Sequence, residues 1–267
     1  MISFYKEKFV KNSDLNINQN IFSGIGIFET IRFIDRKLIF FEDHIERLLL
    51  NTTRFGFKKV DKTQILHHID LTIKKNDLNA GLAKIIFVPS ENFQDIEYYI
   101  FLRKLPSVNS QIVKVSFYNE IDFPILRINS AYKSLFYFGN FLAINDAKSK
   151  NIFEPIFYNK DNFITSGAIK NIFFIKNNTL LTPSLDLGIL NGVTRSKVFE
   201  IAKKLNFSVI ESKIRLSEIN DMDEAFITSA SVGLLACNWE KWECKNIITG
   251  KLKNEYNKIV EKEYISI

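Results

Sequence analysis

The sequence predicts an α+β fold of two domains, each with a mixed β-sheet and helices. Three observations support this prediction: strand-like segments come in pairs, helical segments lie between the pairs, and the same alternation occurs in both halves of the chain. The length of 267 residues is enough for two modest domains with their own cores. The chain is 46% hydrophobic and 25% charged, which is ordinary for a folded soluble protein.

The first half begins with a predicted hairpin. From Gly26, the segment IFETIRFIDRKLIFF alternates apolar and polar residues around the polar centre IDRK, which indicates two strands and a short turn. Residues 42–57 predict an amphipathic helix whose first turn is acidic, as the helix dipole favours. Residues 61–77 predict a second helix. Two further strands are predicted at 82–89 and 95–105.

The polar stretch PSVNSQ predicts a linker, which we place at residues 107–115. It would separate a smaller N-terminal domain, residues 1–106, from a larger C-terminal domain, residues 116–267. The second half again alternates strands with helices. Its predicted segments are a strand at 113–118, a loop and helix within 131–151, strand pairs at 154–167 and 171–183, a helix at 193–207, a strand at 209–216, a short acidic helix at 217–223 and a strand at 224–230.

Charge and cysteine content narrow the function classes. The net charge is +6, but the lysines are scattered without a basic run, so we expect no nucleic-acid binding. Cys237 and Cys244 form no CxxC motif and have no histidine nearby, which indicates neither a zinc site nor a disulfide framework. The start of the chain lacks the apolar core of a signal peptide, and no segment has the roughly 18 apolar residues of a membrane span. We therefore expect a cytoplasmic protein without a metal or a membrane partner.

Lys133 is the first candidate for chemistry. It precedes a run of aromatic residues in NSAYKSLFYFGNFLAINDA. Burial of an ammonium in such a run is costly unless it is paired or loses its proton, and a neutral lysine amine attacks carbonyl groups. A lysine at a helix start also commonly extends along the surface with its charge in water. The residues alone leave both interpretations open.

Two further segments are candidates for anion binding. LNGVTRSKV, residues 190–198, presents free backbone N–H groups and a hydroxyl at a helix start, where a phosphate binds well but where an ordinary N-cap is equally expected. EAFITSAS, residues 224–231, ends in small hydroxyl residues that allow close approach of an anion and also make good turns. GIGIF, residues 24–28, is not a dinucleotide-binding motif, because it lacks the third glycine and precedes a strand.

Taken in order, these segments resemble the fold-type IV pyridoxal-phosphate enzymes. This family comprises branched-chain aminotransferases, D-amino acid aminotransferases and aminodeoxychorismate lyases. The resemblance implies a D-amino acid aminotransferase-like fold with pyridoxal 5'-phosphate at the interface of two domains, usually in a homodimer. The matching segments cover nearly the whole chain and are GIFETIRFIDRKLIFFEDHIERL, YKSLFYFGNFLAINDAK, NFITSGAIKNIFFIKNNTLLTP, LNGVTRSKV and DEAFITSAS.

The resemblance also implies roles for individual residues. Lys133 matches the lysine that forms the Schiff base with the cofactor, which favours the chemical interpretation of this residue. Arg47, in HIERL, matches an arginine that binds the cofactor phosphate. Other phosphate contacts of the family match Val193, Thr194, Ser229 and Ala230.

Ser166 is the main departure from the family pattern. The chain reads Thr165-Ser166-Gly167 where the family has T-E-G, and the family's glutamate binds the ring nitrogen of the cofactor. A neutral serine cannot stabilise a protonated ring nitrogen as a carboxylate does. The change indicates either lyase chemistry in place of transamination or a loss of efficient catalysis.

Two more departures concern the first glycine turn and the substrate. Ile25 replaces the usual aspartate. Pro89-Ser90 replaces an Arg-Gly pair that binds a substrate carboxylate in several members, which leaves Arg32 and Lys84 as candidates for that role.

We expect a 4-amino-4-deoxychorismate lyase that releases pyruvate and forms 4-aminobenzoate for folate synthesis. The short chain favours this activity, and Phe138 follows Lys133 by five residues where branched-chain aminotransferases have a tyrosine. A branched-chain or D-amino acid aminotransferase, with a small amino acid-like substrate, is the alternative. A catalytically impaired relative that binds a ligand or serves as a scaffold is the second alternative, motivated by Ser166.

Overall fold

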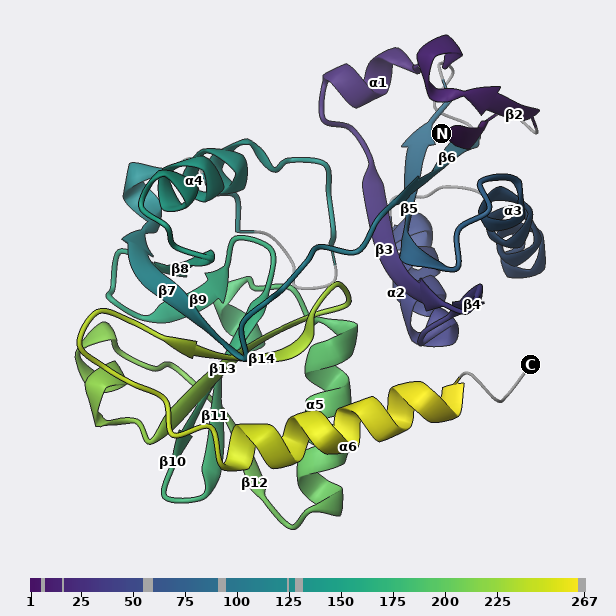
Figure 1. Cartoon of the computed structure of the whole chain (residues 1–267). Helices are drawn as coiled ribbons and strands as arrows, with labels where there is room; N and C mark the ends of the chain where they lie inside the picture. Colours follow the sequence, from purple (N-terminus) through teal and green to yellow (C-terminus); the bar gives the residue numbers. More distant parts are fainter. Residues whose placement is uncertain are drawn as a thin grey trace. The chain divides into compact units, whose positions relative to one another are not determined.

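The computed structural model describes residues 1–5, 8–15, 17–54, 60–90, 95–123, 125–127 and 132–263. The chain divides into two units, each with one sheet and its own helices, which confirms the predicted α+β architecture (Figure 1). Residues 107–115, expected as a linker, belong to unit 2, and their last part forms strand. The ranges are Met1–Pro106, Ala131–Phe136 and Val260–Ile267 for unit 1, and Ser107–Ser130 and Tyr137–Ile259 for unit 2.

Unit 1 contains a six-stranded antiparallel sheet in the order β2-β1-β6-β5-β3-β4. The predicted hairpin is confirmed as β3 and β4, and both predicted helices are confirmed. The strands are β1 (Ile2–Tyr5), β2 (Lys8–Lys11), β3 (Ile27–Ile34), β4 (Lys37–Leu38), β5 (Ala80–Pro89) and β6 (Ile96–Arg103). The helices are η1 (Asn12–Asp14), α1 (Gln19–Phe22), α2 (Phe41–Arg54) and α3 (Lys62–Lys75).

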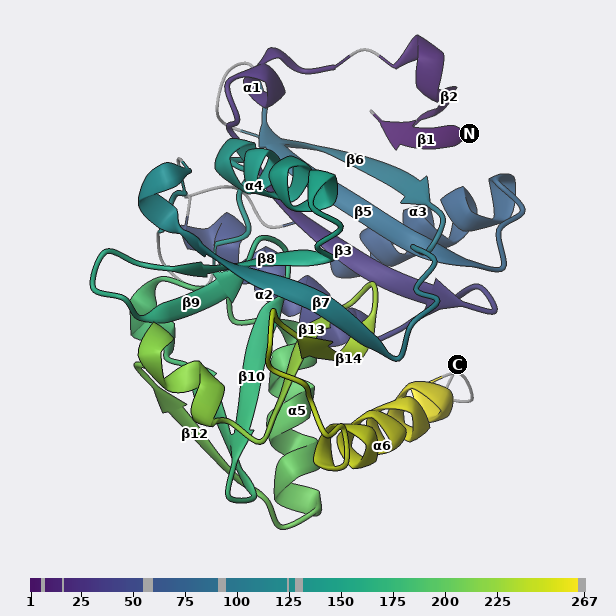
Figure 2. The same cartoon turned by 60° about the vertical axis from the view of Figure 1, so that its left-hand side comes forward.

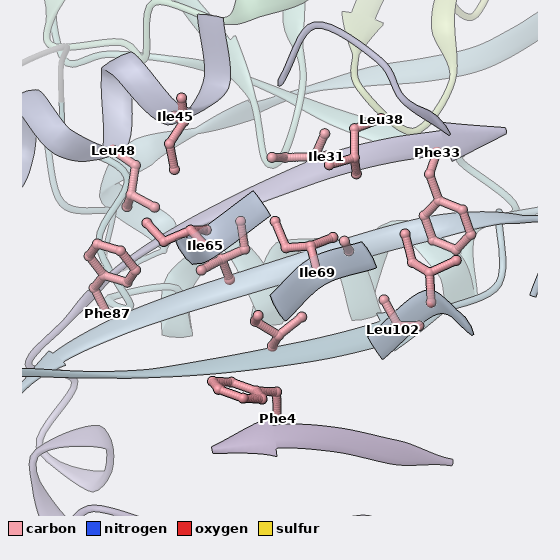
Figure 3. Close-up of a cluster of buried hydrophobic side chains, with 14 of the residues drawn as sticks. Phe4, Ile31, Phe33, Leu38, Ile45, Leu48, Ile65, Ile69, Phe87 and Leu102 are labelled. Carbon is pink, nitrogen blue, oxygen red and sulfur yellow. The ribbon is translucent and has the colours of Figure 1, made fainter. Parts of the chain in front are cut away.

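Helices α2 and α3 pack on one face of this sheet. Residues of β3 alternate between buried and partly exposed along its second half, because successive side chains of a strand point to opposite faces. Ile31 of β3 meets Leu48 of α2 and Ile69 of α3 in a cluster of fully buried side chains (Figure 3). Removal of such a side chain, as in Leu48→Ala, should cost about 2–5 kcal/mol of stability.

Unit 2 contains an eight-stranded mixed sheet in the order β12-β11-β10-β13-β14-β7-β8-β9 (Figure 2). The pairs β11–β12, β14–β7 and β7–β8 are parallel, and the other neighbours are antiparallel. Both predicted strand pairs are confirmed, as β8–β9 and β10–β11. The strands are β7 (Ile112–Asn119), β8 (Glu154–Tyr158), β9 (Ile164–Gly167), β10 (Asn171–Lys176), β11 (Thr179–Pro183), β12 (Ser208–Ser212), β13 (Glu224–Ser229) and β14 (Gly233–Asn238).

The helices of unit 2 lie beside its sheet strands and beside one another. Helix α5 packs against β12 and β13, and α5 and α6 lie side by side, joined by an ion pair of 2.6 Å between Lys204 and Glu255 (Figures 1 and 2). The start of α6 is held by the buried Glu224 carboxylate, which accepts three backbone N–H groups. None of the helices in the described residues is long and apolar enough to cross a lipid bilayer. The helical segments are η2 (Glu120–Asp122), α4 (Phe138–Ser149), η3 (Leu185–Leu187), α5 (Val193–Lys204), η4 (Leu216–Asp221) and α6 (Ile248–Glu263).

Candidate active site

Lys133 is fixed against strand β3 by backbone hydrogen bonds. The Phe28 N–H donates to the Lys133 carbonyl at 2.8 Å, and the Leu135 N–H donates to the Gly26 carbonyl at 3.0 Å. This close approach requires glycine at position 26, because a Cβ there would lie 2.8 Å from a Leu135 methyl carbon. The strand thus sets where the Lys133 side chain begins.

An aromatic ring of strand β3 lies beside the Lys133 side chain. Its Nζ lies 4.8 Å from the centroid of the Phe28 ring, and the residue is partly buried. Of the rings expected around it, those of Phe136, Phe138 and Phe141 are 54%, 68% and 57% exposed, and that of Tyr137 is partly buried. Helix α4 begins at Phe138 and buries the face that carries Ala143, so Phe138 and Phe141 lie on its outer face. One aromatic neighbour of Lys133, Phe28, thus comes from β3, outside the run that follows the lysine.

Arg47 is held in a buried charge cluster of unit 1. Its Nε and Nη2 donate to the two carboxylate oxygens of Glu29 at 2.6 Å and 2.8 Å. The Nδ1 of His44 lies 2.9 Å from the same carboxylate. Glu29 and His44 are almost fully buried, and Arg47 is mostly buried. This geometry fixes the direction of the guanidinium on helix α2.

The pKa values of this cluster follow from burial and from the charges within it. Burial alone would raise the pKa of Glu29, but the charge of Arg47 and the hydrogen bonds from His44 and Arg47 hold it well below its usual range. Burial lowers the pKa of His44, against the hydrogen bond and charge of Glu29, and the charges of Arg47 and Lys133 lower it further. Glu29 is therefore ionised at neutral pH, and its carboxylate accepts a hydrogen bond from the N–H at Nδ1 of His44.

Ser166 lies in β9 of unit 2 and contacts an arginine. The Nη1 of Arg127 donates to the Ser166 hydroxyl at 3.0 Å, and its Nη2 donates to the Thr165 hydroxyl at 2.9 Å. The same guanidinium binds one carboxylate oxygen of Glu120 through Nε and Nη2, at 2.8 Å and 2.6 Å. Thr165 also donates to that oxygen at 2.6 Å. The Arg127 guanidinium thus binds the Ser166 hydroxyl through Nη1 and the Glu120 carboxylate through Nε and Nη2.

The start of helix α5 is open to an anion. Gly192 is its N-cap residue and offers no side-chain acceptor to the first backbone N–H groups of the helix. Asn171 holds this turn, since its Nδ2 donates to the Leu190 carbonyl at 2.8 Å. A Cβ at position 192 would lie 2.2 Å from the Asn171 side-chain oxygen. The turn therefore approaches β10 as closely as only glycine allows, with Val193 and Thr194 directly after it.

A buried hydroxyl lies beside this turn. Thr228 pairs with Asn171 across β13 and β10, so the two side chains point to the same face of the sheet. The Thr228 hydroxyl is buried and has no hydrogen-bond partner among the residues that the structure describes. Ser229 follows it and its hydroxyl lies 2.9 Å from that of Ser231, while Ala230 stands in the turn to β14. An uncapped helix start and an unpartnered buried hydroxyl fit a phosphate group.

Arg32 and Lys84 lie on the face of the unit 1 sheet opposite to α2 and α3. Lys84 is in β5, with its Nζ 4.3 Å from the centroid of the same Phe28 ring that Lys133 contacts. Burial, with the charges of Arg103 and Lys133, lowers the pKa of Lys84 to about 8. The structure thus brings Lys84 and Lys133 to one aromatic ring.

The expected site residues divide between the units. Unit 1 contains Lys133, Arg47, Arg32 and Lys84; unit 2 contains Ser166, Val193, Thr194, Ser229 and Ala230. Sequence reasoning missed the polar partners of these residues, because most of the partners lie on other strands, helices or loops and only the folded structure brings them together. The missed residues are Glu29, His44, Arg103, Glu120, Arg127, Asn171 and Thr228.

Comparison with known proteins identifies the family. Residues 26–238 match the family model described as amino-transferase class IV. The chain is 29% identical over 224 residues to an aminodeoxychorismate lyase of Bacillus subtilis, which covers 79% of this chain and 76% of that protein. It is 26% identical over 224 residues to a D-alanine aminotransferase of Listeria innocua, which covers 78% and 76%.

A solved structure gives the same fold. The branched-chain aminotransferase of Thermoproteus uzoniensis, crystallised with norvaline, superposes with a TM-score of 0.87 at 20% identity. The match covers 98% of this chain and 95% of that chain. At this identity the likeness concerns the fold, and it confirms the expected fold-type IV architecture. The three similar proteins carry three different activities.

Proposed function

The chain belongs to the class IV aminotransferase family of pyridoxal-phosphate enzymes, and on that premise we propose that it is a 4-amino-4-deoxychorismate lyase. Its products would be pyruvate and 4-aminobenzoate, the latter for folate synthesis. The observation that carries this proposal is the Ser166 hydroxyl bound by Arg127, at the position where the family resemblance implies a glutamate. The named activity of the Bacillus subtilis relative supports the same assignment.

We propose that Lys133 bonds to the cofactor and that the α5 start holds its phosphate. When bound, pyridoxal phosphate supplies an aldehyde that bonds to amines and a ring that withdraws electrons from the carbon beside the amine. The uncapped N–H groups at Val193 and Thr194 and the unpartnered Thr228 hydroxyl supply donors for a phosphate. The further phosphate contacts in this proposal are Arg47, Ser229 and Ala230.

In this proposal, Lys133 is also the group that moves protons. Its amine takes the proton from the carbon that bears the substrate's amino group. The C–O bond to the enolpyruvyl group then breaks, its electrons leave with the oxygen, and protonation of the released group yields pyruvate. The remaining ring becomes aromatic, which drives the step. Arg32 and Lys84 bind carboxylates of the substrate and orient it.

The pairing of Ser166 with Arg127 favours elimination over transamination. A neutral hydroxyl backed by a guanidinium disfavours a positive charge on a ring nitrogen placed beside it. The electron withdrawal by the ring is then weaker than with a carboxylate neighbour. A reaction that gains aromaticity tolerates this loss better than amino-group transfer does. The serine is thus suited to the lyase reaction.

The first test is whether Lys133 binds the cofactor. Purified protein with added pyridoxal phosphate should show a visible absorption band that Lys133→Ala abolishes. Lys75→Met is a matched control, because Lys75 also lies over a phenylalanine ring, that of Phe9, at 4.8 Å. A protein that stays colourless with added cofactor would refute the enzyme assignment and favour the scaffold alternative.

The second test separates lyase from transaminase. The wild type should release pyruvate from 4-amino-4-deoxychorismate and transfer little amino nitrogen to 2-oxoglutarate. Ser166→Glu should raise transamination about tenfold or more, because it restores a carboxylate at this position. Amino transfer from branched-chain or D-amino acids without pyruvate release would replace the lyase assignment with the aminotransferase alternative.

We also propose that the protein forms a homodimer. Phe138, Phe141 and Leu142 form an exposed apolar stripe on α4 that a second copy could cover. Light scattering should give twice the chain mass for the wild type and a smaller mass for Phe141→Lys. A monomeric wild type would refute this part of the proposal.

A further inference from the structure

A buried ion pair lies inside the turn between β9 and β10 of unit 2. The Nζ of Lys170 donates to one carboxylate oxygen of Glu154 at 2.6 Å, and the two side chains are 5% and 1% exposed. The other carboxylate oxygen accepts the backbone N–H of Ile169 at 2.8 Å. Glu154 stands at the start of β8, so its carboxylate ties this strand to a side chain and to a backbone group of the turn. We call residues 167–170 the β9–β10 turn.

The Glu154 carboxylate also limits which residue fits at the start of the turn. A Cβ at position 167 would lie 2.6 Å from the Glu154 Oε1 and 3.1 Å from the Lys170 carbonyl oxygen, so a larger residue than glycine would displace one of them. The Gly167 N–H donates to that carbonyl at 2.8 Å. The Ala168 carbonyl accepts the Nδ2 of Asn140, on α4, at 2.7 Å. Contacts from β8 and α4 thus hold the turn in one shape.

The β9–β10 turn joins two residues of the candidate site. Ser166 precedes the turn and is bound by Arg127, and Asn171 follows the turn and holds the Leu190 carbonyl beside the start of α5. The proposed function takes Ser166 as the neighbour of the cofactor's ring nitrogen and the α5 start as the site of its phosphate. Because these two parts of the cofactor belong to one rigid ring system, their protein contacts must keep a matching separation. The shape of the turn sets that separation.

We propose that Glu154 and Lys170 are positioning residues: their ion pair fixes the β9–β10 turn and, through it, the separation of Ser166 from the start of α5. This inference rests on the proposed function in taking these two places as contacts of pyridoxal phosphate. A gain in stability does not explain the pair well, because well-packed apolar residues of similar volume often give equal or greater stability. Apolar residues cannot supply the acceptor that holds the Ile169 N–H. That acceptor gives the pair a role in geometry.

Two double variants separate positioning from stability. The first, Glu154→Leu with Lys170→Met, makes the pair apolar and removes the acceptor of the Ile169 N–H. The second, Glu154→Gln with Lys170→Met, removes both charges and keeps a side-chain oxygen in place. The affinity for pyridoxal phosphate, titrated by visible absorption, should fall about ten- to a hundredfold in the first variant and about threefold or less in the second. Wild-type affinity in the folded first variant would overturn the inference.

Amide hydrogen exchange of the cofactor-free protein supplies a second measurement. Residues 165–171 and 189–194 should exchange about tenfold faster in the first variant than in the wild type, while the rest of unit 2 is unchanged. The second variant should exchange at the wild-type rate. Unchanged exchange of residues 189–194 in the first variant would also overturn the inference. Gly167→Ala takes the place of the first variant if that does not fold, with the same expectations, because its methyl group would displace the Glu154 carboxylate.

Two control variants separate the turn from general effects. Glu224→Gln alters a buried carboxylate that accepts three backbone N–H groups at the start of α6, at the opposite end of β13 from Thr228. It should lower the urea unfolding midpoint and leave the cofactor affinity unchanged. Gly250→Ala matches Gly167→Ala, because nothing lies within 4 Å of a Cβ at position 250. An equal loss of affinity in Glu224→Gln and in the first variant would mean general destabilisation and would refute the positioning role.

The inference and the proposed function fail separately. Loss of cofactor affinity in the first variant of a protein that transfers amino groups without pyruvate release supports the positioning role and refutes the lyase assignment. Pyruvate release by the wild type with unchanged cofactor affinity in the first variant refutes the positioning role and leaves the lyase assignment standing. A wild type that binds no pyridoxal phosphate refutes both.

Discussion

The two faces of the unit 1 sheet differ in whether their charged side chains are paired with opposite charges. On the helix-covered face, the Glu29 carboxylate is bound by Arg47 and His44. On the other face are Arg32, Lys84 and Arg103. None of these three cations forms an ion pair with a carboxylate in the part of the chain that the structure describes. Removal of one member of a compensated cluster is destabilising, because it leaves the remaining buried charge unpaired. An uncompensated cluster costs stability and leaves capacity for a ligand.

The same contrast occurs between two threonines of unit 2. The Thr182 hydroxyl is buried and donates to the Ile172 carbonyl at 2.9 Å. The Thr228 hydroxyl is buried beside the uncapped start of α5 and has no partner. In each unit, one of the unsatisfied atoms lies at or beside a residue that the sequence predicts as a ligand contact: Arg32 in unit 1, and Thr228 next to Ser229 in unit 2. Substitutions can test whether these two groups have a binding role.

The largest expected effect is that of Glu29→Gln. The amide keeps the shape of the side chain but leaves the buried charge of Arg47 without its carboxylate. Stability should fall by about 3–5 kcal/mol, measured by urea unfolding. Glu42→Gln is the control, because it breaks an exposed ion pair with Lys62 and should leave the unfolding midpoint unchanged. A loss below about 1 kcal/mol for Glu29→Gln would contradict the structural role of this cluster.

The same carboxylate predicts a pH dependence. The pKa of Glu29 is lowered in the folded state from its ordinary value of 4.5, so the folded state holds fewer protons than the unfolded state below that pH. Its contribution is present above pH 4.5 and is lost as the pH falls from there toward the folded pKa. The stability difference between wild type and Glu29→Gln should therefore shrink in acid. A constant difference from pH 6 down to pH 3 would show that another group dominates.

Thr228→Val should have a smaller effect on stability than Glu29→Gln, and it should raise stability where Glu29→Gln lowers it. Valine has the shape of threonine, and loss of an unpartnered buried hydroxyl should stabilise the cofactor-free protein by about 1 kcal/mol. The affinity for pyridoxal phosphate should fall about three- to tenfold, since one donor near the α5 start is lost. Urea unfolding and titration of the visible absorption measure the two quantities.

Thr182→Val is the matched control for that change. It removes a satisfied hydroxyl and leaves the Ile172 carbonyl unpaired, so stability should fall by about 1–2 kcal/mol while cofactor affinity stays the same. If both threonine variants lose stability equally, the Thr228 hydroxyl makes a stabilising hydrogen bond as the Thr182 hydroxyl does. The contrast between the two sites then disappears.

Local patterns predicted much of the fold. The alternation from Gly26 to Phe41 gave the β3–β4 hairpin, and the helical periodicity gave α2, α3 and α5. The short β1–β2 hairpin and helix α6 were not predicted. The four-residue strands of the hairpin are too short for a periodic signal, and α6 is capped by Glu224, more than twenty residues away in sequence. A helix cap supplied by a residue so far away in sequence leaves no pattern in the local sequence of the helix.

The sequence predicted the residues of the candidate site but not the residues that contact them. Family resemblance indicated Lys133 and Ser166, but Arg127 reaches Ser166 across 39 positions in sequence. Arg103 joins Arg32 only through Leu82 of the strand between them. The position of Arg103 beside Arg32 depends on sheet register, which hydrophobic pattern alone does not set between distant strands, and Arg127 lies outside the strands.

The smallest expected effect is that of Lys84→Met, and it sharpens the comparison most directly. Burial and the positive charges of Arg103 and Lys133 disfavour the ammonium form of Lys84, so its charge costs stability at neutral pH. Removal of that charge should raise the melting temperature of the cofactor-free protein by about 1–3 °C at pH 7. The pKa of Lys84 is about 8 in the folded protein against an ordinary 10.5, so the wild type loses the unfavourable charge as the pH rises through 8. The advantage of Lys84→Met should therefore shrink between pH 8 and pH 10.5. A lower melting temperature for Lys84→Met at pH 7 would mean that this lysine is compensated like Arg47, and that the two faces of the sheet do not differ.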